Sequence, residues 1–212
     1  PASVVKELLD NALDAGATAI TVTVSHGGKS QIRVIDNGCG MDASDARACL
    51  IRHATSKIAS LDDLEAVVSL GFRGEALPSI ASVARLSLTS REAGVDQAWE
   101  VGDEGHAIRP AALTAGTSVT VRDLFFNTPA RRKFLRTEKT EFGHLEQVVK
   151  RLALVRHDVT FVLTHNGREV LCVQRASDLA SRERRLADLL APGFVQNALY
   201  FEHAAAGIEL SG

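Results

Sequence analysis

The sequence is poor in cysteine, and this excludes two common ways of holding a small fold together. Its three cysteines are Cys39, Cys49 and Cys172, an odd number with no Cys-x-x-Cys pair. A disulfide framework and a structural zinc site are therefore not expected. A reducing compartment is favoured instead.

Aromatic residues, long apolar runs and net charge are also scarce. Aromatic residues make up 5% of the 212-residue chain, so a core must rest on Leu, Val, Ile and Ala. No apolar run approaches membrane-spanning length and no signal peptide is visible, so no membrane partner is expected. The net charge of −2 gives no overall basic signature for nucleic acid, so any DNA contact must come from local patches.

The sequence does contain a series of helical and strand patterns. Its length of 212 residues is enough for one core and part of a second domain. Apolar residues at helical spacing predict a first helix that Gly16 can end. Period-two alternation predicts strands at 20–25 and 31–36, joined by a hairpin turn at Gly27-Gly28. Further predicted helices cover residues 43–51, 75–82, a short stretch after 128, 145–155 and 181–190. Further predicted strands cover residues 85–90, 97–101, 117–123, 159–165 and 168–173.

A carboxylate followed by two glycines ends the strand at 31–36, in the string Asp36-Asn37-Gly38-Cys39-Gly40. A carboxylate there can accept a hydrogen bond from the exocyclic amine of adenine. Gly38 and Gly40 allow ligand and backbone to approach closely because they have no side chain. The alternative is an ordinary turn, since Asn-Gly is a common turn signal.

The first helix carries Glu7, Asn11 and Asp14 on one face, at i, i+4 and i+7. The amide oxygen of Asn11 suits a magnesium ion that keeps several waters and binds ATP phosphates. Glu7, one turn away, can orient or deprotonate a water aimed at the γ-phosphate. With Asp10 the face is strongly acidic without evident cation partners, which favours a metal–phosphate site over a solvated helix face. Asp14 is equally compatible with a structural or capping role.

A second candidate element is Gly71-Phe72-Arg73-Gly74-Glu75, directly before a predicted helix, where backbone N–H groups favour anions. The long polar connection at 52–74 is typical of a functional lid. Within it Lys57 can supply positive charge to phosphates. Thr117, after Gly116, can add a hydroxyl to the phosphates or to Asp36. The alternative for residues 71–75 is an ordinary glycine-rich loop. The alternative for Lys57 is a surface lysine, and for Thr117 a strand residue without a further role.

Two groups of basic residues are candidates for weak, sequence-independent contact with DNA phosphates. The stronger group is Arg131, Arg132, Lys133 and Arg136, and the weaker group is Arg182, Arg184 and Arg185. A solvated charge run is the alternative for both.

Five strings of this sequence resemble the MutL family of DNA mismatch repair proteins: residues 6–18, 36–40, 52–57, 71–77 and 127–135. The last two are the most specific, and the resemblance spans nearly the whole chain. It implies an α+β fold, a two-layer sandwich of a mixed, mostly antiparallel sheet with helices on one face. This is the Bergerat-type ATPase fold shared with DNA gyrase, the ninety-kilodalton heat-shock chaperone and histidine kinases.

The resemblance also implies residue roles. Glu7 resembles the general base, Asn11 the magnesium ligand and Asp36 the carboxylate that reads adenine. Asp10 departs from the family, where Glu is frequent. The further residues that the resemblance places at the ATP site, as lid, phosphate loop or pocket, are Ala15, Gly38, Gly40, Thr55, Ser56, Lys57, Gly71, Phe72, Arg73, Gly74, Glu75, Ala76, Leu77 and Thr117.

The resemblance further implies ATP and Mg²⁺ as cofactors, ATP-driven homodimerisation, and mismatch-recognition and downstream repair proteins as partners, in the bacterial cytoplasm and acting at the nucleoid. We expect an ATPase domain at residues 1–180 without its N-terminal segment. Residues 181–212 are then a linker helix and the truncated start of a second domain, which in relatives supplies a lysine to the γ-phosphate.

Two alternatives remain, one an enzyme of the same fold and the other a protein of a different class. A histidine kinase needs a phospho-accepting helix hairpin and a second glycine-rich box, and neither is found. A non-catalytic DNA-binding module with a vestigial pocket is disfavoured because Glu7, Asn11 and Asp36 are all intact.

Overall fold

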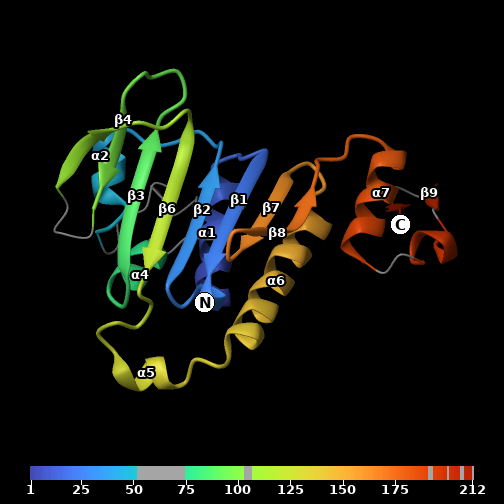
Figure 1. Ribbon diagram of the computed structural model, residues 1–212. Coiled ribbons are helices and arrows are strands. Elements are labelled where there is room, and N and C mark those ends of the chain that lie inside the picture. The colour runs from blue at the N-terminus through green and yellow to red at the C-terminus, as the bar shows by residue number, and fades with distance from the viewer. Residues whose placement is uncertain (52–74, 103–106, 191–192, 200, 206–207, 212) are drawn as a thin grey trace.

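The computed structural model describes residues 1–51, 75–102, 107–190, 193–199, 201–205 and 208–211 (Figure 1). Its main sheet contains β1 (Ala19–Ser25), β2 (Gln31–Asp36), β3 (Arg85–Arg91), β4 (Ala98–Val101), β5 (Ile108–Ala111), β6 (Gly116–Arg122), β7 (Thr160–His165) and β8 (Arg168–Val173). The strand order is β5-β4-β3-β6-β2-β1-β7-β8. The β1–β7 pair is parallel and the other neighbouring pairs are antiparallel, which confirms the predicted mixed, mostly antiparallel sheet.

Helices cover one face of this sheet, so the fold has the two layers that the sequence predicted (Figure 1). The helices are α1 (Ala2–Asp14), α2 (Ala43–Ala48), α4 (Ala76–Ala81), α5 (Pro129–Lys133), α6 (Glu138–Val155) and α7 (Leu179–Leu189), with 3-10 turns η1 (His26–Gly28) and η2 (Val195–Asn197). The strands β9 (Glu202–Ala205) and β10 (Ile208–Ser211) form a separate antiparallel pair. In Figure 1, α1, α2 and α4 lie behind the sheet, and α6 packs beside α1.

The core is aliphatic, as the composition predicted. The inward residues of β1 and the apolar stripe of α1 are buried against each other. Among the largest fully buried side chains that the structure describes, only Phe161 is aromatic. The hairpin predicted at Gly27-Gly28 is present as η1, and both glycines have positive φ, 64° and 85°.

Two predicted helices differ from the structure by three residues or more at one end, and one strand of the main sheet was not predicted. The helix expected at 43–51 ends at Ala48, and the Asp42 side chain caps its start by accepting the Asp45 N–H. The helix expected at 145–155 begins at Glu138, because the Thr137 side chain caps it by accepting the Thr140 N–H. Strand β5 was not predicted. It is a short edge strand that contains Pro110 and shows no apolar–polar alternation.

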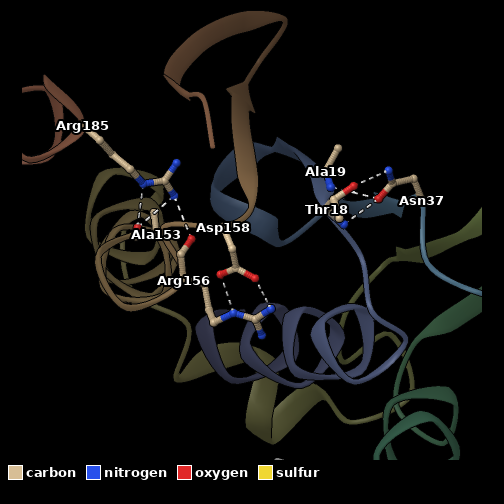
Figure 2. Close-up of polar contacts among 7 residues, drawn as sticks. All are labelled: Thr18, Ala19, Asn37, Ala153, Arg156, Asp158 and Arg185. Carbon is tan, nitrogen blue, oxygen red and sulfur yellow. Dashed lines mark hydrogen bonds and ion pairs between the residues drawn. The ribbon is translucent and has the colours of Figure 1, made fainter. Parts of the chain in front are cut away.

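The prediction that the weaker basic group contacts DNA is wrong for Arg185, because its side chain is only 4% exposed and is not available to DNA. Its guanidinium donates to the carbonyls of Ala153 and Arg156 at the C-terminal end of α6 (Figure 2). It also donates to the carbonyl of Gln174. Burial lowers the pKa of Arg185. This arginine satisfies carbonyls that have no partner within the helix, and it fastens α7 to α6.

The division of the chain at residues 180/181 stays a prediction.

Candidate functional site

A row of three polar side chains takes the place of a core row at one end of the sheet. Across β2, β6 and β3 the register gives two successive apolar rows, Ile32–Val121–Leu86 and Val34–Val119–Leu88. The next row along the same strands is Asp36–Thr117–Ser90. These three residues are 8%, 8% and 0% exposed. Buried polar groups at positions where the pattern calls for apolar ones cost stability and therefore point to function.

Asp36 is an acceptor held in a desolvated position. Its Oδ1 accepts the Gly38 N–H at 2.9 Å. Burial raises the pKa of Asp36, and hydrogen bonds from the backbone of Gly38 and Thr117 oppose that rise. No cation pairs with it within the described part of the chain. A buried carboxylate of this kind is suited to a ligand that offers a hydrogen-bond donor, as the amine of adenine does.

The glycines after Asp36 allow the loop to pack tightly. A Cβ on Gly38 would lie 2.7 Å from both the Cβ and the carbonyl oxygen of Ala15. A Cβ on Gly40, whose φ is +70°, would lie 1.9 Å from the carbonyl oxygen of Arg91. The Cys39 N–H also donates to the Ala15 carbonyl at 2.9 Å. The end of α1 and strand β3 therefore both abut this loop, and Ala15 lies beside Gly38.

Asn37 was not assigned a role from the sequence, and the structure gives it a structural one. Its Oδ1 accepts the backbone N–H groups of Thr18 and Ala19, each at 2.9 Å, and its Nδ2 donates to the Thr18 hydroxyl (Figure 2). Asn37 thus fixes the loop to the connection between α1 and β1. The Asp-Asn-Gly string is therefore a turn, and its hydrogen bonds hold the loop beside Asp36 in place.

Ser90 is the site residue that the sequence analysis missed. Its Oγ accepts the Met41 N–H at 2.9 Å and lies 2.9 Å from Oγ1 of Thr117. It also lies within hydrogen-bonding distance of the Gly116 carbonyl, at 3.1 Å. A signal was available, because Leu86, Leu88 and Ser90 share one face of β3 and only the last is polar.

On α1, Glu7 is exposed and Asn11, one turn later, is half-buried, so both are on the helix that leads to the loop. The acidic face is not free of cations, however. Lys6 Nζ lies 2.6 Å from Asp10 Oδ2, and Asp10 is 4% exposed. The hydrogen bond to Asp10 raises the pKa of Lys6. The expectation that these acids lack a cation partner is therefore wrong for Asp10.

Asp14 lies within the electrostatic reach of another cation. The pKa of Arg156 is raised mainly by its hydrogen bond to Asp158 and also by the charge of Asp14. Arg156 and Asp158 form a two-point ion pair (Figure 2). The argument for a metal–phosphate site on α1 therefore rests on Glu7 and Asn11. In the described residues, no three His, Cys, Asp or Glu side chains gather as a metal site. Magnesium held by Asn11 would thus depend on phosphate and water for its other ligands.

The lid and phosphate-loop predictions are mostly outside the described residues. This applies to Thr55, Ser56, Lys57, Gly71, Phe72, Arg73 and Gly74. Glu75 is the N-cap of α4, and Ala76 and Leu77 form its first turn. Helix α4 contacts β3, the strand that carries Ser90.

The stronger basic group is on an exposed element. Helix α5 has no buried residue, and Arg131, Arg132, Lys133 and Arg136 are all exposed. In Figure 1, α5 follows β6 and lies beyond the end of the sheet opposite to the polar row. Nucleotide and DNA contacts would therefore occupy separate surfaces.

Known proteins resemble this chain in sequence. Residues 1–102 match the family described as histidine kinase-, DNA gyrase B-, and HSP90-like ATPase. The whole chain is 58% identical to the DNA mismatch repair protein MutL of Azotobacter vinelandii and 56% identical to that of Pseudomonas fluorescens (strain SBW25), in each case covering 34% of the relative. The chain therefore spans about a third of the length of these relatives.

Solved structures agree with the sequence relatives. The Aquifex aeolicus MutL ATPase domain complexed with ADP is 35% identical, with a TM-score of 0.69 over 95% of this chain and 70% of that chain. The N-terminal domain of a DNA repair protein is 26% identical, with a TM-score of 0.75 over 95% of this chain and 60% of that one.

No helix in the described residues is long and apolar enough to cross a membrane.

Proposed function

Because this chain belongs to the MutL family of DNA mismatch repair proteins and matches the ATPase domain of that family, we propose that it binds Mg²⁺-ATP and hydrolyses it slowly as a switch. The observation that carries the proposal is the buried row Asp36–Thr117–Ser90 beside the Gly38 loop and the end of α1. The row offers a ligand the desolvated carboxylate of Asp36 and the hydroxyl of Thr117, while the fully buried Ser90 hydroxyl is bonded to Thr117 within the protein.

The catalytic part of the proposal belongs to α1. Asn11 would offer its amide oxygen to magnesium, which would help to neutralise the charge of the phosphates. Glu7 orients the attacking water and accepts its proton. Lys57 and the backbone of residues 71–77 are proposed to hold the phosphates.

The wider role that we propose is that of a switch within a longer bacterial protein. ATP binding drives dimerisation of this domain, and the dimer engages mismatch-recognition and downstream repair proteins in the cytoplasm. Support comes from the relatives, of which this chain covers about a third. The exposed arginines of α5 add weak contact with DNA phosphates.

Nucleotide selectivity tests the adenine site. Asp36→Asn in the full-length protein replaces a two-acceptor carboxylate by an amide that offers N–H groups to the base. ATP affinity should fall about 10- to 150-fold, because a charged hydrogen bond is worth about 1.5–3 kcal/mol, whereas GTP affinity should change little. Guanine carries a carbonyl where adenine carries its amine, so the wild type should prefer ATP. Isothermal titration of both nucleotides measures this, and equal wild-type affinities would remove Asp36 as the base reader.

DNA affinity tests the basic group. Replacing Arg131, Arg132 and Lys133 by Glu should weaken DNA binding and flatten the plot of log affinity against log salt by about 2–3 units, since each phosphate contact contributes about 0.9. ATP binding and the melting temperature should persist, because no residue of α5 is buried.

The matched control for that experiment is the double variant Arg182→Glu with Arg184→Glu, two exposed arginines on α7. It shifts net charge in the same direction on another surface and should have a smaller effect on the salt dependence. A large fall in melting temperature with no specific loss of DNA binding would show that the α5 arginines are structural.

A further inference from the structure

The face of the main sheet that the helices leave uncovered is basic, although the net charge of the chain is −2 (Figure 1). Alternate residues of β1, β2, β3 and β6 point to this side, which we call the open face. Most of these outward residues are Ser or Thr, and none is Asp or Glu. The charged ones are Arg33, Arg85, Arg91 and Arg122. Because the chain contains 26 Asp and Glu residues, a surface with cations alone is a local feature.

Three of these arginines are neighbours at one end of the open face. Arg122 on β6 is directly opposite Arg85 on β3. On β2 it is opposite Gln31, two residues before Arg33, so Arg33 is its diagonal neighbour. All three arginines are exposed. Like charges directly opposite each other in a sheet are destabilising, so this arrangement favours a role in binding an anion over a role in the fold.

Carboxylates within the protein offset little of this charge. Asp123 Oδ2 lies 3.7 Å from Nε of Arg85. Among the described residues, no carboxylate forms an ion pair with Arg33 or Arg122. The Nε of Arg33 donates to the Ser118 hydroxyl at 3.2 Å, which ties this arginine to the neighbouring strand. The positive charge of the open face is therefore held in place and is available to a ligand.

The side chains of the open face suit phosphate groups. Arginine, serine and threonine are among the side chains that hold the DNA backbone. The core of a protein–protein interface is instead rich in apolar and aromatic residues. At the outward positions of these four strands, Ile35 is the only large apolar residue and none is aromatic, so unpaired bases find nothing to stack on. The chemistry therefore favours the phosphates of a DNA duplex.

The open face also continues toward the basic group of α5. Arg122 is the last residue of β6, and α5 follows β6 beyond that end of the sheet (Figure 1). On the side of β4 the cationic surface ends, because Glu100 lies next to Thr89 and pairs with Arg109 at 2.8 Å. The arginines of the open face and those of α5 can thus contact one DNA backbone.

We propose that the open face is a second contact surface for the phosphates of duplex DNA, with Arg33 and Arg122 as its main contacts. The proposal rests on the DNA contact proposed above for α5 and adds a surface on the sheet itself. Contacts to phosphate are independent of base sequence. The buried row that includes Asp36 points to the other face of the sheet, so DNA and nucleotide do not compete.

The test is the double variant Arg33→Glu with Arg122→Glu in the full-length protein, titrated with a fluorescent duplex at several salt concentrations. The plot of log affinity against log salt should flatten by about 1.8 units, since each lost phosphate contact contributes about 0.9. ATP affinity and the melting temperature should persist, because both side chains are exposed. Arg182→Glu with Arg184→Glu makes the same change of charge on α7 and should flatten the plot less.

Wild-type DNA affinity and salt dependence in the open-face variant, beside a loss in the α5 variant, would overturn this proposal and leave the α5 contact standing. Absence of duplex binding by the wild type would remove both. If the glutamate variant does not fold, Arg33→Gln with Arg122→Gln loses the same two contacts and should flatten the plot by the same amount. Polyglutamate is the probe for an acidic protein partner, and binding as tight as that of a duplex of equal charge would overturn the assignment to DNA.

Discussion

Glu7→Ala in the full-length protein should bind Mg²⁺-ATP with wild-type affinity and hydrolyse it about 10²–10⁴-fold more slowly. The reason is geometric and chemical. Glu7 is an exposed carboxylate on α1, one helical turn from Asn11, and α1 ends at the loop that follows Asp36. Removing the base leaves the contacts to adenine and magnesium in place. Nucleotide titration and steady-state phosphate release separate the two effects.

Glu7→Gln sharpens the experiment, because it keeps the size of the side chain and removes only its basicity. It should lose nearly as much turnover as the alanine variant. Glu183→Gln, an exposed acid on α7, is the matched control and should leave turnover unchanged. Wild-type turnover in Glu7→Gln, with ATP still bound, would assign the base to another group.

The sequence was most informative where local pattern and burial agree. The strands that alternate strictly, such as β1 and β3, were predicted within one or two residues, because one face of each packs on the helices. Asp36 was singled out because a carboxylate at the end of a strand, followed by two glycines, can accept a hydrogen bond from the amine of adenine, and the structure shows that Asp36 is buried. The short edge strand β5 was missed because its residues are exposed and carry no alternation.

The remaining site features depend on pairing between distant segments, which a single sequence does not encode locally. Ser90 belongs to the buried polar row only because β6 lies between β2 and β3 and places Thr117 next to it. From the sequence alone Arg185 resembles a surface arginine, and only the packing of α7 on α6 buries it. The Lys6–Asp10 pair was within reach of sequence reasoning, since i, i+4 neighbours on a helix face each other.

Gly116→Ala should cost about 2–5 kcal/mol of the free energy of unfolding and abolish measurable ATP binding. Gly116 has a φ of +79°, which costs a residue with a side chain about 1–2 kcal/mol. Its Cβ would also lie 2.1 Å from the Asp36 carbonyl oxygen and 2.8 Å from the Asn37 Cα. Overpacking of this kind costs about 1–3 kcal/mol more, because both neighbours are backbone and cannot rotate away. Relief requires β2 and β6 to separate where Asp36 and Thr117 pair.

Gly94→Ala is the control that isolates the clash from the dihedral strain. Gly94 has nearly the same φ, +82°, but nothing lies within 4 Å of its Cβ position. It should lose only about 1–2 kcal/mol and keep its ATP affinity. Urea unfolding monitored by circular dichroism gives the stabilities, and titration of the folded proteins gives the affinities. Equal losses in the two variants would mean that the contact between Gly116 and Asp36 does not shape the pocket. A larger loss at Gly116 with intact ATP binding would place the nucleotide elsewhere in the fold.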